Sequence, residues 1–447
     1  MHTAPKLGLR ERLVFAGYQC VARALQVVLP LKLAKRARLE PGYGVDVPAR
    51  FGRYPDAQAT PAEAQQWVWV HAVSLGETRA SVALVNQLRE QYPQLKLLLT
   101  HGTATGLDAG RALLHEGDVQ TWLPWDSASA VNGFLKHFRP RLGLIMETEV
   151  WPTLCVACVR HGVPLYVVNG RMSQRSMDKA LRLATLSRLA FRHLAGVVAQ
   201  TADDAQRFQS LGATVVGTVG NLKFDMPINA HQVDLGQTLA KRLPKPVVML
   251  ASSREGEEAQ WLQAMHQLSA AQRNQVQWLL VPRHPQRVAA VQLLLEGAGW
   301  QVSLRSAWGE QLQHMADRTS GDAPTVWLGD SIGEMALYYA TSRVALLGGS
   351  FEALGGQNLI EAAACSCVVV AGPHTFNFSQ ATEQAIEAGA CLRVDDMTQA
   401  LAAALDLVQP QAGQPPAYQA RAFAALAWTN RHRGAAKRTL ALLAHSL

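Results

Sequence analysis

The 447-residue sequence lacks the short motifs that identify several large enzyme classes. Neither Gly-x-Gly-x-x-Gly nor Gly-x-x-x-x-Gly-Lys-Ser/Thr occurs, which argues against NAD-dependent enzymes and P-loop enzymes. An Asp-x-Asp element that would hold a metal-bound sugar nucleotide is also missing. If the chain handles a phosphate leaving group, Arg, Lys and helix-start amides therefore have to balance the developing charge.

Cysteine is scarce, with six residues in the whole chain. Cys155 and Cys158 have the spacing of a zinc or redox pair, but no second pair at metal-ligand spacing accompanies them. Cys365 and Cys367 stand in an apolar run and are expected to be small buried residues. These observations predict a reduced, cytosolic chain that holds no metal.

The N-terminus contains no long uninterrupted apolar run. Residues 1–40 carry eight Lys or Arg against two Glu, and so hold most of the net charge of +8. Arg23 interrupts the apolar stretch 13–31, which disfavours a cleaved signal peptide and makes a membrane-spanning helix costly. We expect an amphipathic helix that lies on an anionic membrane surface, apolar side down. The alternative is an amphipathic helix packed on the protein itself.

A nucleic-acid partner fits the charge pattern less well. Beyond residue 40 the net charge is small, and no basic stripe interleaved with aromatic residues is present. We expect no nucleic-acid binding.

Short continuous apolar runs alternate with longer amphipathic stretches along the rest of the chain. This pattern is typical of parallel sheets covered by helices on both faces, and the length favours two domains. The predicted fold is α/β, with two doubly wound Rossmann-like domains. The expected segments are a membrane-associating helix (1–40), an N-terminal α/β domain (41–226), a proline-containing linker (227–246), a C-terminal α/β domain (247–425) and a closing helix (426–447).

In the first domain, three groups of charged residues follow predicted strands, where ligands of such sheets bind. Glu77 opens a helix after Ser74, where the helix dipole should keep its carboxylate ionised and available as a base. The same pattern is also an ordinary capping box. Glu147 and Glu149 stand together at a strand tip, and Lys223 precedes the linker.

In the second domain, the loops after the strands are rich in groups that bind anions. Residues 251–257 join a strand to a helix whose amino end can hold a phosphate. Arg283 follows the next strand and presents a guanidinium suited to planar oxyanions. Glycine pairs at 348–349 and 355–356 allow the backbone to approach a ligand closely, and Glu361 is placed like a ribose-binding acid.

Several of these motifs occur together in the order found in Kdo transferases, the enzymes that transfer 3-deoxy-D-manno-octulosonic acid (Kdo) in lipopolysaccharide synthesis. The chain resembles this family in Ser74-Leu75-Gly76-Glu77, Glu147-Thr148-Glu149-Val150-Trp151-Pro152, Gly220-Asn221-Leu222-Lys223-Phe224-Asp225, Pro282-Arg283-His284-Pro285, Gly333-Glu334-Met335, Gly348-Gly349-Ser350 and Gly372-Pro373-His374-Thr375-Phe376-Asn377-Phe378.

The resemblance implies a GT-B fold with an inter-domain cleft, and an inverting reaction that needs neither metal nor cofactor. It implies CMP-Kdo as the donor, a tetraacylated and phosphorylated lipid A precursor (lipid IVA) as the acceptor, and the cytoplasmic face of the inner membrane as the location. Glu77 takes the proton-acceptor role, and Glu147 and Lys223 fall where the family stabilises the transition state. The CMP-binding segments fall on Pro282, Arg283, Gly333, Glu334, Met335, Asn358, Leu359, Ile360 and Glu361.

Two departures from the family pattern are present. Gln357-Asn358-Leu359-Ile360-Glu361-Ala362 stands where the family usually has His-Asn-Pro-Leu-Glu-Pro, and Ser253-Arg254 stands where it often has Thr-His. Two alternatives stay open at the level of sequence: another GT-B enzyme that uses a uridine donor, and a catalytically inactive scaffold on the membrane surface.

Overall fold

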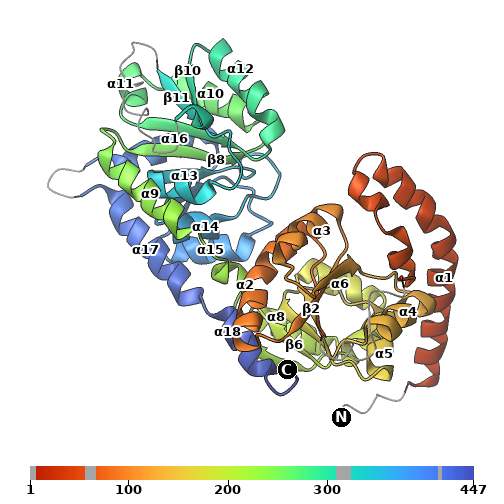
Figure 1. The fold of residues 1–447 in the computed structure, drawn as a ribbon. Helices are drawn as coiled ribbons and strands as arrows, with labels where there is room; N and C mark the ends of the chain where they lie inside the picture. Colours follow the sequence, from red (N-terminus) through yellow and green to blue (C-terminus); the bar gives the residue numbers. More distant parts are fainter. Residues whose placement is uncertain (1–6, 56–66, 309–323, 411–414) are drawn as a thin grey trace. The chain divides into compact units, whose positions relative to one another are not determined.

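In the computed structural model the chain forms two compact units (Figure 1). The structure describes residues 7–55, 67–308, 324–410 and 415–447, so the first six residues of the predicted membrane helix lie outside it. Unit 1 comprises residues 1–227 and 433–447, and unit 2 comprises residues 228–432.

Unit 1 is built around a seven-stranded parallel sheet in the order β3-β2-β1-β4-β5-β6-β7. Its strands are β1 (Trp67–His71), β2 (Lys96–His101), β3 (Val119–Trp122), β4 (Leu142–Met146), β5 (Leu165–Gly170), β6 (Gly196–Ala199) and β7 (Val215–Thr218). Its α-helices are α1 (Leu9–Ala37), α2 (Leu75–Gln91), α3 (Ala104–Gly110), α4 (Ala128–Phe138), α5 (Pro152–Arg160), α6 (Gln174–Arg182), α7 (Ala184–Arg192), α8 (Ala202–Ser210) and α18 (Ala435–Leu443).

Both faces of this sheet are buried, because alternate residues of each strand point to opposite sides. In β1, Trp67 and Trp69 belong to one apolar cluster, while Val68 and Val70 belong to another. This explains why the sequence shows continuous apolar runs rather than an alternation of polar and apolar residues.

Unit 2 repeats the architecture with the strand order β10-β11-β9-β8-β12-β13-β14, again parallel throughout. Its strands are β8 (Val247–Ser253), β9 (Gln277–Pro282), β10 (Gln301–Leu304), β11 (Thr325–Leu328), β12 (Ser342–Leu347), β13 (Val368–Ala371) and β14 (Cys391–Arg393). Its helices are α9 (Ala230–Arg242), α10 (Glu257–Gln267), α11 (Ala270–Arg273), α12 (Val288–Gly297), α13 (Met335–Thr341), α14 (Leu359–Ala364), α15 (Ser379–Glu387), α16 (Met397–Val408) and α17 (Ala417–His432). The predicted fold of two doubly wound α/β units is confirmed.

The segment 227–246, expected to be a linker, contains the helix α9, which packs on α13. Its three prolines lie outside the helix, and Asn229 caps its first turn by accepting a hydrogen bond from the Gln232 amide. The expected closing helix 426–447 is divided between the end of α17 and α18. Gly434, with a φ of 91°, separates the two helices, and α18 packs against α2 in unit 1.

The helix α1 has a mixed character. It is long and apolar enough to cross a membrane by length and composition. Yet Tyr18 and Gln19 donate hydrogen bonds to Asp126 and Thr153, beside α4 and α5. Most of its aliphatic side chains are exposed, whereas Leu33 is buried. The helix is therefore attached to unit 1 by polar contacts and by Leu33, which packs in an apolar cluster with Tyr43 and Trp122, while most of its other aliphatic side chains are exposed.

Candidate active site

Glu77 lies in the first turn of α2, directly after β1. Its amide donates to Ser74 Oγ at 3.4 Å, and its carboxylate accepts from Ser74 Oγ and from the Val73 amide, both at 2.9 Å. The capping role is therefore real. The cap holds the carboxylate in one orientation at the carboxyl edge of the sheet, so capping and a chemical role are compatible.

Burial opposes the expected stabilisation of the ionised Glu77 carboxylate by the helix dipole. Burial raises the pKa of its carboxyl to about 7, and the neighbouring charge of Glu147 adds to this. The hydrogen bonds from Val73 and Ser74 act in the opposite direction and are weaker. A carboxyl with a pKa near neutrality is well suited to accept a proton during a reaction.

Glu147 and Lys223 are brought together beside Glu77. Glu147 follows β4 in the left-handed backbone region, with a φ of 59°, and its amide donates to Val168 O at 3.0 Å. Its Oε1 lies 3.6 Å from Lys223 Nζ, and both side chains are largely shielded from solvent. Glu149, the second acid of this tip, accepts from Trp151 Nε1, and burial raises its pKa. The ends of β1 and β4 and a short turn thus bring together three acids, Glu77, Glu147 and Glu149, and a lysine.

Lys223 is positioned by two asparagines, neither of which was predicted as a site residue. It lies in a 3-10 turn, η5 (Leu222–Asp225), whose start is capped by Asn221 through a bond to the Lys223 amide at 2.9 Å. Asn169, buried at the end of β5 with a φ of 53°, accepts from the Leu222 amide at 3.0 Å. Its Nδ2 has no partner in the described part of the chain. The sequence signal was an Asn-Gly pair directly after an apolar run.

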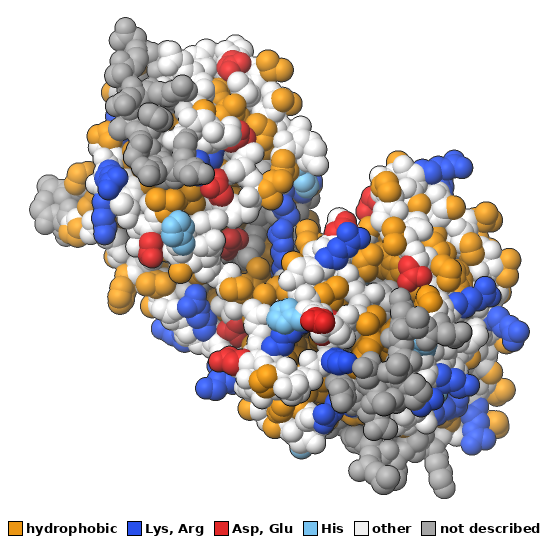
Figure 2. Space-filling view, in the orientation of Figure 1, with side chains coloured by type: hydrophobic (Ala, Val, Ile, Leu, Met, Phe, Trp, Pro, Cys, Tyr) orange, Lys and Arg blue, Asp and Glu red, His pale blue; other side chains and the backbone are white. Residues whose placement is uncertain are grey.

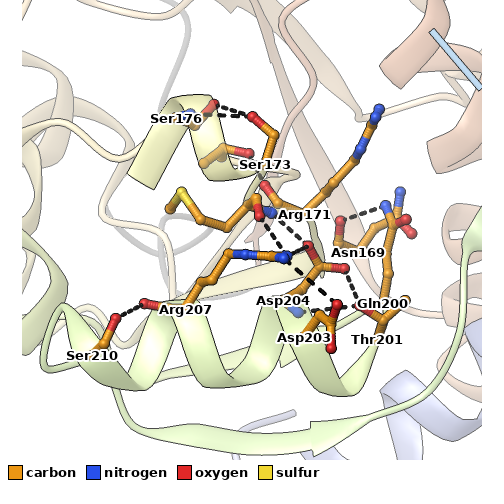
Figure 3. A network of polar contacts seen from close by, with 12 residues as sticks. Asn169, Arg171, Ser173, Ser176, Gln200, Thr201, Asp203, Asp204, Arg207 and Ser210 are labelled. Atoms are coloured by element: carbon orange, nitrogen blue, oxygen red, sulfur yellow. Dashed lines mark hydrogen bonds and ion pairs between the residues drawn. The ribbon is translucent and has the colours of Figure 1, made fainter. Parts of the chain in front are cut away.

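A polar network fixes the segment that follows Asn169 (Figure 3). Gln200 Nε2 donates to Asn169 O at 3.0 Å, and Asp204 accepts from the Met172 amide at 2.8 Å. Arg207 donates to Met172 O and pairs with Asp203. The Arg171 side chain extends away from these contacts (Figure 3). These contacts hold the turn after β5 in place, and Asn169 links them to the turn that carries Lys223.

In unit 2, Arg283 follows β9 at the carboxyl edge of the sheet. Its amide donates to Ser253 O at 3.0 Å, and its Nε donates to Gln357 Oε1 at 3.2 Å. The backbone N–H of Gln357 in turn donates to Gly348 O at 3.1 Å. Gln357, one of the departures from the family pattern, therefore links the predicted CMP-binding arginine to the glycine loop.

The glycine loop after β12 passes very close to the end of β8. A Cβ at Gly348 would lie 2.3 Å from Ser252 O and 2.5 Å from Ala251 O, so no other residue fits without moving the backbone. The amides of Gly349 and Phe351 donate to the buried carboxylate of Glu257 at 2.8 and 3.1 Å. An internal carboxylate thus holds this loop.

The other cations near the β8 end are already paired. Arg287 forms a bidentate ion pair with Glu258, with Nη1 2.7 Å from Oε1 and Nη2 2.9 Å from Oε2. Arg254 Nε lies 3.1 Å from Glu255 Oε2. These ion pairs between residues of the chain itself stabilise the start of α10.

The remaining residues predicted to bind the sugar nucleotide lie at the starts of α13 and α14, except Pro282, which ends β9. Asn358 caps α14 by accepting from the Ile360 amide at 3.1 Å, and Glu361 is half-buried in its first turn. Leu359, Ile360 and Pro282 are buried, so their side chains serve the core and only their backbone can meet a ligand.

The turn Gly333–Met335 contacts a different set of residues. Glu334 lies 2.8 Å from Arg305 and accepts from Ser331, while Gly333 O accepts from Gln232 at 3.0 Å.

No group of three or more metal-ligating side chains occurs within the described ranges. All six cysteines are free thiols, and Cys155, Cys158, Cys365 and Cys367 are buried, as predicted for the second pair. Burial raises the pKa of the Cys155 and Cys158 thiols, so both stay protonated and unreactive.

Comparison with known proteins identifies the family. A sequence model described as 3-deoxy-D-manno-octulosonic-acid transferase (kdotransferase) matches residues 46–226. A 3-deoxy-D-manno-octulosonic acid transferase of Bordetella pertussis is 43% identical over 432 residues, covering 95% of this chain and 97% of the relative. The chain belongs to the Kdo transferase family. A Kdo transferase of Haemophilus influenzae is 31% identical and covers 82% of this chain and 84% of the relative.

The fold of this Kdo transferase family member is that of GT-B proteins. The UDP-GlcNAc 2-epimerase from Neisseria meningitidis matches with a TM-score of 0.56 and 14% identity, over 85% of this chain and all of that chain. A glycosyltransferase from Rickettsia africae matches with a TM-score of 0.53 and 12% identity, over 85% and 98%. The predicted GT-B fold and the assignment as a glycosyltransferase are confirmed.

Proposed function

We propose that this enzyme transfers Kdo from CMP-Kdo to a phosphorylated lipid A precursor, lipid IVA, with inversion at the anomeric carbon. Glu77 removes the proton from an acceptor hydroxyl. The oxygen of that hydroxyl forms a bond to the anomeric carbon, while the bond from that carbon to the CMP phosphate breaks. The observation that carries this proposal is the Glu77 carboxyl, whose pKa is raised to about 7 beside the Glu147–Lys223 pair.

In this proposal, Glu147 and Lys223 stabilise the charges that are present in the transition state. Cationic character develops on the Kdo ring as the phosphate departs, and a nearby carboxylate stabilises it. Lys223 offers a cation to the Kdo carboxylate, and its ion pair with Glu147 holds its ammonium in place. In unit 2, Arg283 takes the CMP phosphate, with the starts of α13 and α14 as further donor-binding segments. The reaction as proposed requires no metal ion.

Replacing Glu77 with Gln tests the base. We expect turnover to fall by ~10²–10⁴-fold, because a positioned general base contributes about that much. CMP affinity should stay unchanged, because Glu77 belongs to the acceptor side of the reaction. The assay follows release of CMP from CMP-Kdo generated in place, with a lipid A precursor as the acceptor. Glu90→Gln, an exposed change at the other end of α2, is the matched control; full activity of Glu77→Gln removes the assignment.

Two further measurements test the identity of the nucleotide donor and the absence of a metal requirement. Stronger inhibition by CMP than by UDP supports the cytidine donor, and the reverse order favours a uridine-using enzyme. Full activity in the presence of EDTA is expected. A chain that binds CMP but shows no turnover with any acceptor would be a membrane-surface scaffold.

We also propose that α1 attaches the enzyme to the cytoplasmic face of the inner membrane, lying in the interface. Its exposed aliphatic side chains and its arginines and lysines support this location. Salt washing of membranes distinguishes electrostatic attachment of α1 from burial of its apolar side chains in the bilayer. Complete release at moderate salt indicates electrostatic contact, whereas retention indicates that apolar side chains are buried in the bilayer.

A further inference from the structure

A cavity of about 510 Å³ lies between α1 and the helices α4 and α5 of unit 1. Two arginines line it, Arg23 from α1 and Arg160 from α5. Polar side chains, among them Gln19, Ser129 and Asn132, complete the lining. No Asp or Glu belongs to this lining, and the volume is within the range of small-molecule sites.

Within the described residues, no carboxylate forms an ion pair with Arg23 or Arg160, the two arginines of this cavity. The nearby carboxylate of Asp126 is already used, because it accepts from the Thr153 and Leu154 amides, each at 2.8 Å, and from the Tyr18 hydroxyl. Two guanidinium groups without a counter-ion favour an anionic ligand, and phosphate suits their planar fork of donors.

One edge of the cavity continues into apolar surface. Val27 lies one helical turn after Arg23 on the same side of α1, and Leu31 lies one turn further. Their side chains are 78% and 73% exposed. Along the part of the surface that α1 forms, hydrophobic and basic side chains lie side by side (Figure 2). A ligand that fits this arrangement has an anionic head and an aliphatic tail.

We propose that the cavity between α1, α4 and α5 binds the headgroup of an anionic phospholipid. The phosphate lies between Arg23 and Arg160, and an acyl chain follows Val27 and Leu31 along the helix. This site is separate from the residues assigned to sugar transfer, and it deepens the proposed membrane association by naming its lipid. A specific headgroup site would fix the orientation of unit 1 on the bilayer, which scattered basic residues do not.

Cys20 provides a built-in probe of this cavity. It lines the cavity and is exposed, whereas the other five cysteines are buried. The rate at which a maleimide modifies Cys20, read by mass spectrometry of the full-length protein, should fall at least fivefold with dihexanoyl phosphatidylglycerol. Dihexanoyl phosphatidylcholine and inorganic phosphate are the comparison ligands. Protection by the anionic lipid alone supports the proposal; equal protection by phosphate replaces it with a free-anion site, and no protection by any ligand overturns it.

Variants separate the site from general attraction to a charged surface. R23Q/R160Q removes two charges from the cavity, and R10Q/K32Q removes two exposed charges of α1 outside it. On vesicles of phosphatidylglycerol and phosphatidylcholine, we expect the cavity variant to bind at least tenfold more weakly than the control. Equal losses overturn the proposal. Melting temperatures of both variants verify folding, and neither lipid experiment measures sugar transfer, so a failure of the proposed reaction leaves this test intact.

Discussion

At the scale of single residues, the pKa of the proposed proton acceptor, Glu77, depends on its neighbours. The pKa of Glu77 is raised to about 7, first by burial and then by the charge of Glu147, so its protonated form predominates below neutral pH. We therefore expect the wild-type kcat/KM to fall as the pH drops below about 7, because the base becomes protonated.

Replacing Glu147 with Gln tests this coupling. Removal of a negative charge favours ionisation of Glu77, so the acidic limb of the pH–rate profile should move to lower pH. The plateau should fall as well, because Lys223 loses its ion-pair partner. The measurement is kcat/KM from pH 5 to 9 for both proteins. An acidic limb that stays in place or moves to higher pH contradicts the assignment of that limb to Glu77.

Asn169 gives a second prediction at this scale. Replacing it with Gly keeps the left-handed backbone without strain but leaves the buried Leu222 amide without its acceptor. We expect the free energy of unfolding to fall by ~1–3 kcal/mol. Urea denaturation measures this. The matched change Asn86→Gly removes an exposed asparagine of α2 and measures the general cost of a new glycine in a helix, which relative to Asn is about 0.3 kcal/mol.

At the scale of elements, the turn η5, which carries the proposed catalytic Lys223, is hydrogen-bonded to the start of helix α18. The carboxylate of Asp225, two residues after Lys223, accepts from the Gly434 and Ala436 amides at 2.5 and 2.6 Å. It therefore caps the start of α18, which packs on α2, the helix that carries Glu77. One short turn thus connects the helix of the proposed base with the proposed lysine.

Replacing Asp225 with Asn should weaken this connection. The substitution removes a negative charge that interacts favourably with the positive, N-terminal end of the α18 dipole. We therefore expect the free energy of unfolding to fall by ~0.5–2 kcal/mol. Chemical denaturation monitored by circular dichroism gives this value. Asp203→Asn, at an exposed position in the first turn of α8, is the control for a helix-start acid outside this connection. No difference between the two variants contradicts the capping role.

The strands and their order of appearance were predictable, because each buried parallel strand is a continuous apolar run. Helix α9 was missed because prolines on both sides of 230–242 made the whole segment resemble a linker, although they lie outside the helix. The acids and the lysine of the candidate site were predictable from motifs. The bond between Asn169 and Leu222 was not, since it joins residues far apart in the chain and depends on the fold.

At the scale of the whole molecule, the proposed roles divide between the two units. We expect CMP to stabilise the protein against heat, by ~2.7 kcal/mol at a concentration one hundred times its Kd. Arg283→Ala should abolish this stabilisation, whereas Glu77→Gln should retain it in full. Differential scanning calorimetry of the full-length chain with and without CMP makes the comparison. The opposite pattern would assign nucleotide binding to unit 1.

The path of the chain has a consequence for how the protein is made. The chain leaves unit 1 at Pro227 and returns to it at Arg433. On the ribosome, unit 2 is therefore synthesised completely before the last piece of unit 1 emerges. Until then, the apolar surface that α18 covers with Leu440 and Leu443 stays open on the nascent protein. A stop codon at the start of the segment 433–447 would spare every proposed catalytic residue and still leave unit 1 incomplete.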